Sequence, residues 1–337
     1  MGKTNPFAEL STTAMRKRLK KPFPQFIPPM LATLTDDYFA DSNWVYEHKF
    51  DGERCIAFKR NGVVTLKSRN RNVINTEYPE LVQALTDQAA DNFVIDGEII
   101  ATDKHGLSDF QLLQGRMNLK NIRSTKSNRS KVPISYRIFD IMYLDQYDLR
   151  QLGLIDRKHI LKKMLHFNQA LVYSNELTGD GIKLFNKACH LKWEGLIVKA
   201  AHSAYVGKRS KDWLKFKCIM QEELIIVGYT EPQGQRTDFG ALLVGYYQKQ
   251  KLIFAGKVGT GYSQATLKLL GAKLRKLEIK KCPIAEYNES TNGVHWVRPE
   301  LVAEFKFAEW TKAGRLRAPR YKGLRDDKVA QEVVREG

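Results

Sequence analysis

The sequence predicts an α+β chain of two domains, in which a mixed domain built on antiparallel sheets is followed by a small β-barrel. Strand and helix patterns mix up to Cys218, whereas the residues after Gln221 contain short strands around one helical pattern. The 337 residues, of which 43% are hydrophobic, are enough for two or three hydrophobic cores. We therefore expect a basic N-terminal arm at 1–27, the mixed domain at 28–219 and the barrel at 220–337.

The first domain is expected to follow a polar, basic segment and a proline-rich extended entry. Residues 44–48 are aromatic and β-branched, which predicts a strand that ends at Lys49. Asp51-Gly52 predicts a turn, so that residues 54–58 would start the return strand. The apolar spacing predicts helices at 78–90, 109–114 and 149–166, and the basic stretch 116–131 is typical of a loop.

After residue 221 the pattern changes to short strands separated by glycine-containing loops. Strands are predicted at 224–229, 241–248, 252–258 and 301–310, and a helix at 264–277. About five strands with one helix fit a small Greek-key barrel, and periodicity alone would also fit other small β-barrels.

The chain carries a formal charge of +18 and has a pI near 9.6. This charge favours a polyanionic partner, most simply nucleic acid, although a basic composition can also serve solubility. Because Cys55, Cys189, Cys218 and Cys282 show no C-x-x-C spacing, we expect reduced thiols in a cytosolic protein rather than a zinc site or a disulfide framework. No apolar run is long enough to span a bilayer, and the N-terminus lacks the apolar core of a signal peptide.

The segment Lys49-Phe50-Asp51-Gly52-Glu53-Arg54 suits nucleotidyl transfer. A lysine amine at a strand end can attack a nucleotide phosphate once it has lost its proton. An unperturbed lysine has a pKa of about 10.4, which a neighbouring cation such as Arg54, a bound divalent metal ion or burial would lower. The plain alternative is an Asp-Gly hairpin with charged flanks.

Four further segments follow in an order that adds the missing chemistry. Lys215 and Lys217 are two apart in a predicted strand, so both ammonium groups would point to one face and hold a phosphate; a solvated strand edge is the alternative. Taken alone, Asp96-Gly97-Glu98 also fits a turn, and Phe139 also fits a position in a hydrophobic core. The four segments are Asp96-Gly97-Glu98, Phe139-Asp140, Glu194 to Lys199, and Trp213 to Lys217.

This ordered set resembles the ATP-dependent DNA ligases of the covalent nucleotidyltransferase superfamily. The resemblance runs from about Pro28 to the C-terminus and includes Ser68-Arg69-Asn70 and the run from Arg315 to Lys328. With Trp296 to Pro299 and Glu304 to Phe307, that run is most similar to small bacterial ligases and to the ligase modules of bacterial end-joining enzymes. The resemblance implies an adenylation (nucleotidyltransferase) domain followed by an OB-fold barrel.

The resemblance also implies a role for each candidate residue. Lys49 would be the catalytic nucleophile, which forms a lysyl-AMP from ATP. The other candidates would contact the nucleotide, the DNA, or Mg²⁺, for which Mn²⁺ is the alternative. Phe139 and Glu47 would contact adenine, Glu98 would contact the ribose, and Lys215 and Lys217 would contact the α-phosphate. Arg54 and Arg69 would contact the ribose or the DNA 5′-phosphate, and Arg325, Asp327 and Lys328 would contact the pyrophosphate. Glu194, Asp51 and Glu98 would bind the metal ion.

The implied function is the sealing of 3′-OH/5′-phosphate nicks in duplex DNA, in DNA repair or end joining, by a monomer in the bacterial cytosol or nucleoid. A Ku-like repair protein would be a fitting partner. An RNA ligase and a GTP-dependent capping-type nucleotidyltransferase share the Lys-x-Asp-Gly chemistry and are the enzymatic alternatives. A noncatalytic nucleic-acid-binding protein is the alternative of another class, which would bind DNA without becoming adenylated.

Overall fold

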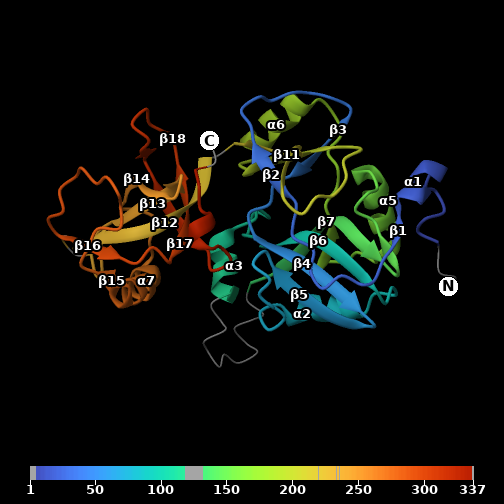
Figure 1. Ribbon diagram of the computed structural model, residues 1–337, viewed down its shortest axis with the longest axis horizontal. Coiled ribbons are helices and arrows are strands. Elements are labelled where there is room, and N and C mark those ends of the chain that lie inside the picture. Colours follow the sequence, from blue (N-terminus) through green and yellow to red (C-terminus); the bar gives the residue numbers. More distant parts are fainter. Residues whose placement is uncertain (1–4, 118–131, 219, 233, 235, 336–337) are drawn as a thin grey trace. The chain divides into compact units, whose positions relative to one another are not determined.

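The computed structural model describes residues 5–117, 132–218, 220–232, 234 and 236–335 (Figure 1). Contacts within the chain divide it into two units, Met1–Cys218 and Ile219–Gly337. The sequence places this boundary after residue 219, which lies outside the described residues, as does most of the predicted loop 116–131. Over the described ranges, no helix is both long and apolar enough to cross a membrane.

The larger sheet of the first unit, sheet A, has the strand order β1-β8-β7-β6-β4-β5. These neighbours pair antiparallel, and β9 adds to β7 in parallel. Asn61 and Gly62, which join β4 to β5, both have positive φ, as a tight two-residue hairpin turn requires. The strands are β1 Leu19–Lys20, β4 Glu53–Arg60, β5 Val63–Ser68, β6 Phe93–Ala101, β7 Ile134–Leu144, β8 Tyr147–Asp148 and β9 Leu171–Tyr173.

The second sheet, sheet B, has the order β2-β11-β10-β3. The β10 strand pairs antiparallel with both of its neighbours, and β2 pairs parallel with β11. The strands are β2 Leu31–Leu34, β3 Trp44–His48, β10 Gly195–Ala200 and β11 Arg209–Lys217.

The strand predicted at 44–48 is confirmed as β3, but the prediction that 54–58 return beside it is wrong. The β3 strand pairs with β10 in sheet B, whereas β4 pairs with β5 and β6 in sheet A. Residues 49–52 therefore carry the chain from one sheet to the other. A turn signal reports a change of direction but not the pairing partner, which is decided by the separate cores that Tyr46 and Cys55 enter.

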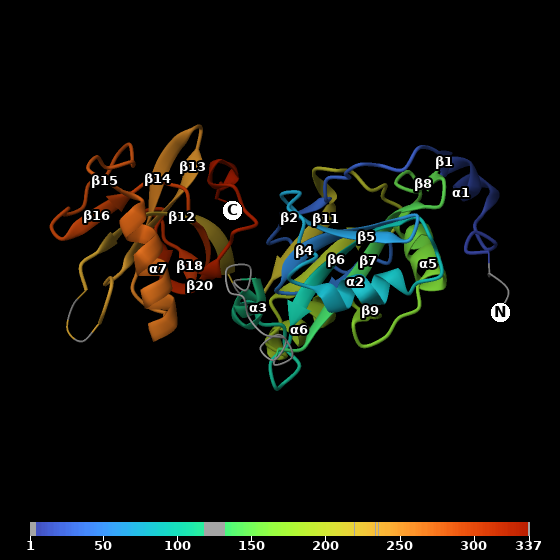
Figure 2. The same ribbon diagram turned by 90° about the horizontal axis from the view of Figure 1, so that it is seen from below.

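Helices and the second sheet cover the two faces of sheet A (Figures 1 and 2). On one face, α2 (Pro79–Thr86), α3 (Phe110–Met117) and most apolar residues of α5 (Leu154–Met164) pack into a core with the strands. These helices correspond to the three predicted at 78–90, 109–114 and 149–166. The opposite face meets sheet B through a smaller core that contains Phe139 and Trp213.

The outer face of sheet B is covered by α6 (Gly181–His190), which was not predicted. Its Phe185 packs with Tyr46 and Phe216 of the sheet. The N-cap Asp180 accepts a hydrogen bond from the Lys183 N–H, a local signal that marks this helix start. The first unit is therefore layered, with the two sheets facing each other between helices.

The described part of the N-terminal segment, from residue 5 onward, packs on the first unit. It contains α1 (Thr12–Lys17), and β1 pairs with β8 at the edge of sheet A. Phe7 is buried in the core of that sheet, and the Arg18 guanidinium lies 4.2 Å from the centroid of the Tyr147 ring. A basic composition did not reveal this docking, because a few apolar and aromatic contacts decide it.

The second unit is built on a sheet with the order β14-β13-β12-β16-β15, to which β17 and β20 add beyond β12. A two-stranded sheet pairs β18 with β19. Ser263 caps α7 (Gln264–Lys276), which confirms the predicted helix, and η2 is a short 3₁₀ helix at Ala330–Glu332. The strands are β12 Met220–Thr230, β13 Leu242–Gln248, β14 Lys251–Val258, β15 Glu278–Ile279, β16 Val294–Val297, β17 Val302–Phe307, β18 Glu309–Trp310, β19 Leu316–Arg317 and β20 Arg320–Leu324.

Three predicted strands of the second unit are confirmed, whereas 301–310 is divided between β17 and β18, which lie in different sheets. The described strand pairings do not close into a ring. The long β12 strand changes its pairing partner along its length. It pairs with β17 over residues 220–225 and with β16 over residues 228–230. A single core with Phe254, Trp296 and Phe305 lies inside this curled sheet. The fold is a small, strongly curved β domain with one covering helix.

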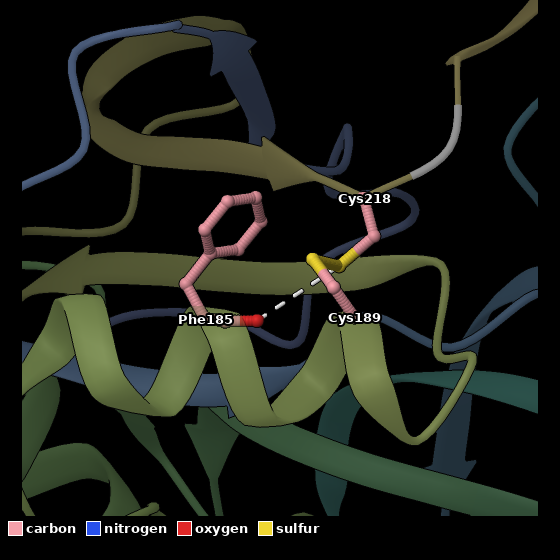
Figure 3. The surroundings of a disulfide bond; sticks show 3 residues. All are labelled: Phe185, Cys189 and Cys218. Atoms are coloured by element: carbon pink, nitrogen blue, oxygen red, sulfur yellow. Dashed lines mark hydrogen bonds between the residues drawn. A yellow bond between two sulfur atoms is a disulfide. The ribbon is translucent and has the colours of Figure 1, made fainter. Parts of the chain in front are cut away.

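Cys189 and Cys218 form a disulfide, so the expectation of four reduced thiols is wrong for this pair (Figure 3). Their Cα atoms are 5.1 Å apart although 29 positions separate them in the sequence. Cys55 and Cys282 remain free. Motif spacing detects only local cysteine pairs, whereas this pair forms because α6 packs against sheet B. The bridge ties the end of α6 to the residue that follows β11.

Candidate active site

Lys49 lies at the junction of the two sheets and forms an ion pair with Glu194. Its backbone N–H donates to the Gly195 carbonyl at 3.1 Å, which continues the pairing of β3 with β10. Glu194 immediately precedes β10, so the ends of two neighbouring strands bring the amine and the carboxylate together. Lys49 and Glu194, which are 145 positions apart in the sequence, thus form one side of the candidate site. The prediction that they act together requires this proximity.

Gly195 must be glycine for this strand end to form. Its φ is +150°, and a Cβ there would lie 1.9 Å from the Phe216 carbonyl oxygen. Gly52 is restricted in the same way, because a Cβ would lie 2.2 Å from the Ile99 carbonyl oxygen. The glycines of both motifs therefore permit close backbone approach beside Lys49.

The two predicted phosphate lysines follow Trp213 on β11. Side chains alternate along a strand, so Trp213, Lys215 and Lys217 share a face, and Trp213 lies in the core between the sheets. Lys217 stands opposite Gly195 across the strand pair, next to the Lys49–Glu194 contact. The structure thus brings this lysine pair to the same strand ends as Lys49.

The other two residues predicted for metal binding, Asp51 and Glu98, lie at or beside the turn that follows Lys49. Asp51 is buried, and its N–H donates to the Ser108 hydroxyl at 3.1 Å. Glu98 lies on β6, where its Cγ would be 3.0 Å from a Cβ at Gly52. Among the described residues, no three His, Cys, Asp or Glu side chains form a metal cage. These oxygen donors fit Mg²⁺, which binds a few carboxylates and completes its shell with phosphate and water.

Arg54 is bound by Asp96 and therefore differs from a free phosphate ligand. Its Nε and Nη2 atoms contact the two Asp96 oxygens at 2.6 and 2.7 Å, and the Tyr205 hydroxyl donates to the same carboxylate at 2.7 Å. Burial opposes the charge, but Asp96 raises the pKa of Arg54 above its ordinary value. The guanidinium carbon also lies 4.6 Å from the Phe139 ring centroid. Arg69 follows β5 and is half-buried.

Phe139 lies in a buried cluster of cations and aromatic rings. The Lys199 Nζ atom is 4.3 Å from the centroids of both Phe139 and Trp213, whose rings meet edge to face. Burial, together with Lys158, lowers the pKa of Lys199 to about 8 against the opposing charge of Glu47. Phe139, which is predicted to contact adenine, is thus only 8% exposed and already contacts the cations of Arg54 and Lys199.

Glu47, predicted to accept from adenine, is held by residues of its own unit. Its Oε1 accepts from Lys158 at 2.8 Å, and its Oε2 accepts from Lys199 and from the Ser174 hydroxyl, each at 3.0 Å. Burial opposes ionisation, but the two ammonium groups keep the pKa of Glu47 below its ordinary value. The contacts indicate a positioning role for this carboxylate.

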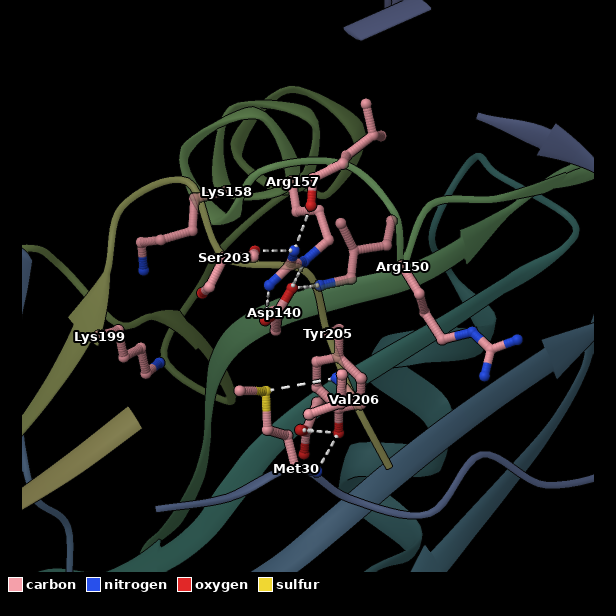
Figure 4. Close-up of polar contacts among 12 residues, drawn as sticks. Met30, Asp140, Arg150, Arg157, Lys158, Lys199, Ser203, Tyr205 and Val206 are labelled. Atoms are coloured by element: carbon pink, nitrogen blue, oxygen red, sulfur yellow. Dashed lines mark hydrogen bonds and ion pairs between the residues drawn. The ribbon is translucent and has the colours of Figure 1, made fainter. Parts of the chain in front are cut away.

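A further buried ion pair joins Arg157 of α5 to Asp140, which directly follows Phe139 in the sequence (Figure 4). The guanidinium contacts both carboxylate oxygens, at 2.7 and 2.9 Å, and also donates to the Leu152 and Ser203 carbonyls. Sequence reasoning missed the roles of Arg157, Lys158 and Lys199, although Lys199 belongs to a selected segment. Charges at alternating or helical spacing are typical of solvated faces, so no local signal distinguished these.

The predicted pyrophosphate residues lie in the second unit, where Arg325 pairs with Asp327 and Lys328 pairs with Glu223. The Nε and Nη2 atoms of Arg325 donate to Asp327 at 2.8 and 2.9 Å, and Lys328 lies 3.0 Å from Glu223. Burial opposes ionisation of Asp327, but the charge of Arg325 lowers its pKa below the ordinary value. Arg325 and Asp327 are buried, and Glu223 is a shared partner of Arg325 and the half-buried Lys328.

The chain resembles known proteins over both units. The family model "ATP dependent DNA ligase domain" matches residues 29–217, and "ATP dependent DNA ligase C terminal region" matches 235–328. The multifunctional non-homologous end joining protein LigD of Pseudomonas aeruginosa is 37% identical over 324 residues, which cover 94% of this chain and 37% of that protein. DNA ligase 2 of Methanosarcina acetivorans is 32% identical, with 91% and 57% of the two chains covered.

A solved structure of mycobacterial DNA ligase D complexed with ATP and MES matches with a TM-score of 0.65 and 32% identity, covering 92% of this chain and 98% of that one. The two units therefore have the folds of a nucleotidyltransferase domain and a C-terminal OB-fold domain. The chain belongs to the ATP-dependent DNA ligases. It spans 37% to 57% of the length of the two curated relatives named above.

Proposed function

We propose that this chain seals nicks in duplex DNA with ATP, through a lysyl-AMP on Lys49. The observation that carries the proposal is the Lys49–Glu194 pair at the sheet junction, with the end of the strand that bears Lys215 and Lys217 beside it. It draws further support from the family match and from the relatives named for end joining and DNA ligation. The formal charge of +18 suits a polyanionic substrate.

The chemistry would proceed by three displacements at phosphorus. The Lys49 nitrogen attacks the α-phosphorus of ATP, the bond to the pyrophosphate oxygen breaks, and the amine loses its proton. A 5′-phosphate oxygen of the nick then takes the AMP, which breaks the P–N bond. The 3′-hydroxyl finally attacks the activated 5′-phosphate and releases AMP. In each step the protein mainly orients the groups and balances charge.

The side chains around Lys49 divide these tasks. We assign the α-phosphate to Lys215 and Lys217, the ribose to Glu98, and the ribose or DNA 5′-phosphate to Arg54 and Arg69. Phe139 would support adenine as part of its cluster with Lys199, and Glu47 would keep that lysine in place rather than accept from the base. A bound Mg²⁺ or Mn²⁺ would screen phosphate charge, held by Glu194, Asp51 and Glu98. In the second unit, Arg325, Asp327 and Lys328 are assigned to pyrophosphate.

The cellular setting is also part of the proposal. We propose a monomer that acts in the bacterial cytosol or nucleoid, in repair or end joining, with a Ku-like protein as partner. The support is the similarity to proteins named for non-homologous end joining.

The proposal is tested by covalent labelling. Wild type and Lys49→Ala protein are incubated with α-labelled ATP or GTP and Mg²⁺, and are then chased with nicked DNA or nicked RNA. We expect label from ATP on the wild type only, and its discharge by nicked DNA with sealing. Label from GTP, or discharge by RNA alone, would instead support the capping-type or RNA-ligase alternatives. Binding to DNA without any label would support a noncatalytic protein.

A further inference from the structure

Three aromatic rings form a column beside Lys49. The His48 ring stacks on the Trp193 indole, with 3.8 Å between centroids and an interplanar angle of 10°. It also packs against Phe50, at 4.3 Å and 35°. We name Trp193, His48 and Phe50 the Lys49 column. The Arg137 guanidinium, from sheet A, lies 5.5 Å from the Phe50 centroid and extends the column toward that sheet.

The column brackets the ion pair of the site. His48 and Phe50 flank Lys49 on its two sides in the sequence, and Trp193 immediately precedes Glu194. Ring contacts therefore join the two segments that carry the amine and the carboxylate. The backbone bond from Lys49 to Gly195 joins the same segments on the strand side. Loosening the rings would let one segment shift against the other without breaking the sheet.

The column is compatible with a cation beside it. Burial, and then the charges of Arg137 and Lys49, lower the pKa of His48 to about 3. The imidazole is therefore neutral near pH 7 and does not repel the Lys49 ammonium. An aromatic ring that carries no charge would serve the same purpose, which makes His48→Phe a conservative variant.

We propose that Trp193 and His48 are positioning residues for self-adenylation, because the column holds Lys49 and Glu194 at a fixed separation. The inference rests on the proposed function of Lys49. A displaced amine slows attack on phosphorus steeply, whereas nucleotide affinity depends on other groups. The column should consequently affect the rate at saturating ATP more than the ATP concentration that gives half of that rate.

The test measures the rate of covalent labelling by α-labelled ATP as a function of ATP concentration. For Trp193→Ala and His48→Ala, we expect the saturating rate to fall about 10-fold while the half-saturating ATP concentration changes less than about 2-fold. Trp193→Phe and His48→Phe, which keep a ring, should stay within about 3-fold of wild type.

A matched control removes another stacked histidine. His295 lies on the Tyr229 ring at 4.8 Å and 9° in the second unit, so His295→Ala should reduce thermal stability without altering the saturating rate of labelling. Folded Trp193→Ala and His48→Ala proteins that match wild type in the saturating rate would overturn the proposal. If Trp193→Ala does not fold, the comparison of His48→Ala with His48→Phe decides in the same way. An unlabelled wild type would refute the proposed function itself.

Discussion

Two cation–carboxylate pairs of the first unit, Lys49 with Glu194 and Arg157 with Asp140, place similar charges in different settings. The Arg157–Asp140 side chains are 0% exposed and are joined by two hydrogen bonds, whereas Lys49 is 16% and Glu194 7% exposed. Arg157 also donates to two backbone carbonyls. A planar guanidinium enclosed in this way is fixed in place, whereas a flexible lysine at a strand end can exchange its partner. One pair therefore supports the fold and the other is available for chemistry.

The largest expected effect separates activity from stability at Lys49. We expect Lys49→Ala to lower self-adenylation at least about a thousandfold, because the nucleophile is lost. Its unfolding free energy should fall by about 1–2 kcal/mol, less than for a fully enclosed pair, because Lys49 and Glu194 keep 16% and 7% of their side-chain surface exposed. Labelling with α-labelled ATP and urea denaturation measure the two quantities. A labelled Lys49→Ala protein would mean that another group is the nucleophile.

At Arg157 we expect the main effect of substitution to be on the unfolding free energy. Arg157→Met leaves Asp140 buried without its cation, so we expect a loss of about 3–5 kcal/mol in unfolding free energy by urea denaturation. Arg150→Ala is the control, because its pair with Asp148 is partly exposed and should cost less than about 1 kcal/mol. Equal losses at the two arginines would contradict the structural role of the buried pair.

The disulfide between Cys189 and Cys218 lies close to the Lys49–Glu194 pair, and its removal tests how much this covalent bond stabilises the first unit. Cys218 donates its N–H to the Glu194 carbonyl at 3.0 Å, and a loop of this length suggests about 3–4 kcal/mol of stabilisation. We expect that loss for the Cys189→Ser/Cys218→Ser protein by denaturation, and for wild type with reductant. Cys282→Ser should be close to neutral. An unchanged denaturation midpoint of wild type with reductant would show that the bridge does not stabilise the protein.

His48 should give the smallest effect, visible in the pH dependence of stability. Its folded pKa of about 3 lies below the ordinary 6.5, so the unfolded chain binds more protons between these values. Stability from this group is thus present above pH 6.5 and is lost as pH falls toward 3. We expect wild type to lose about 3 kcal/mol more than His48→Phe between pH 6.5 and 4. Parallel stability curves for the two proteins would contradict the lowered pKa.

Much of the site could be predicted because its residues lie in short motifs with glycines that the backbone needs. Lys49 with Gly52, and Glu194 with Gly195, are examples in which each glycine permits a close approach that no other residue allows. The partners of Glu47 and Arg54 could not be predicted. Lys158 and Asp96 are 111 and 42 positions away from them, and nothing local distinguishes a buried lysine or aspartate from a solvated one.

The sequence by itself determined the family, the order of the two units, and most strands and helices, and it selected Lys49 as the candidate nucleophile, because local periodicity and motif residues carry that information. Only the tertiary structure decided that β3 and β4 enter different sheets, that Cys189 meets Cys218, and that the N-terminal segment docks on sheet A. These outcomes depend on which distant surfaces bury one another. That choice is made by the packing of whole cores, which no short stretch of sequence contains.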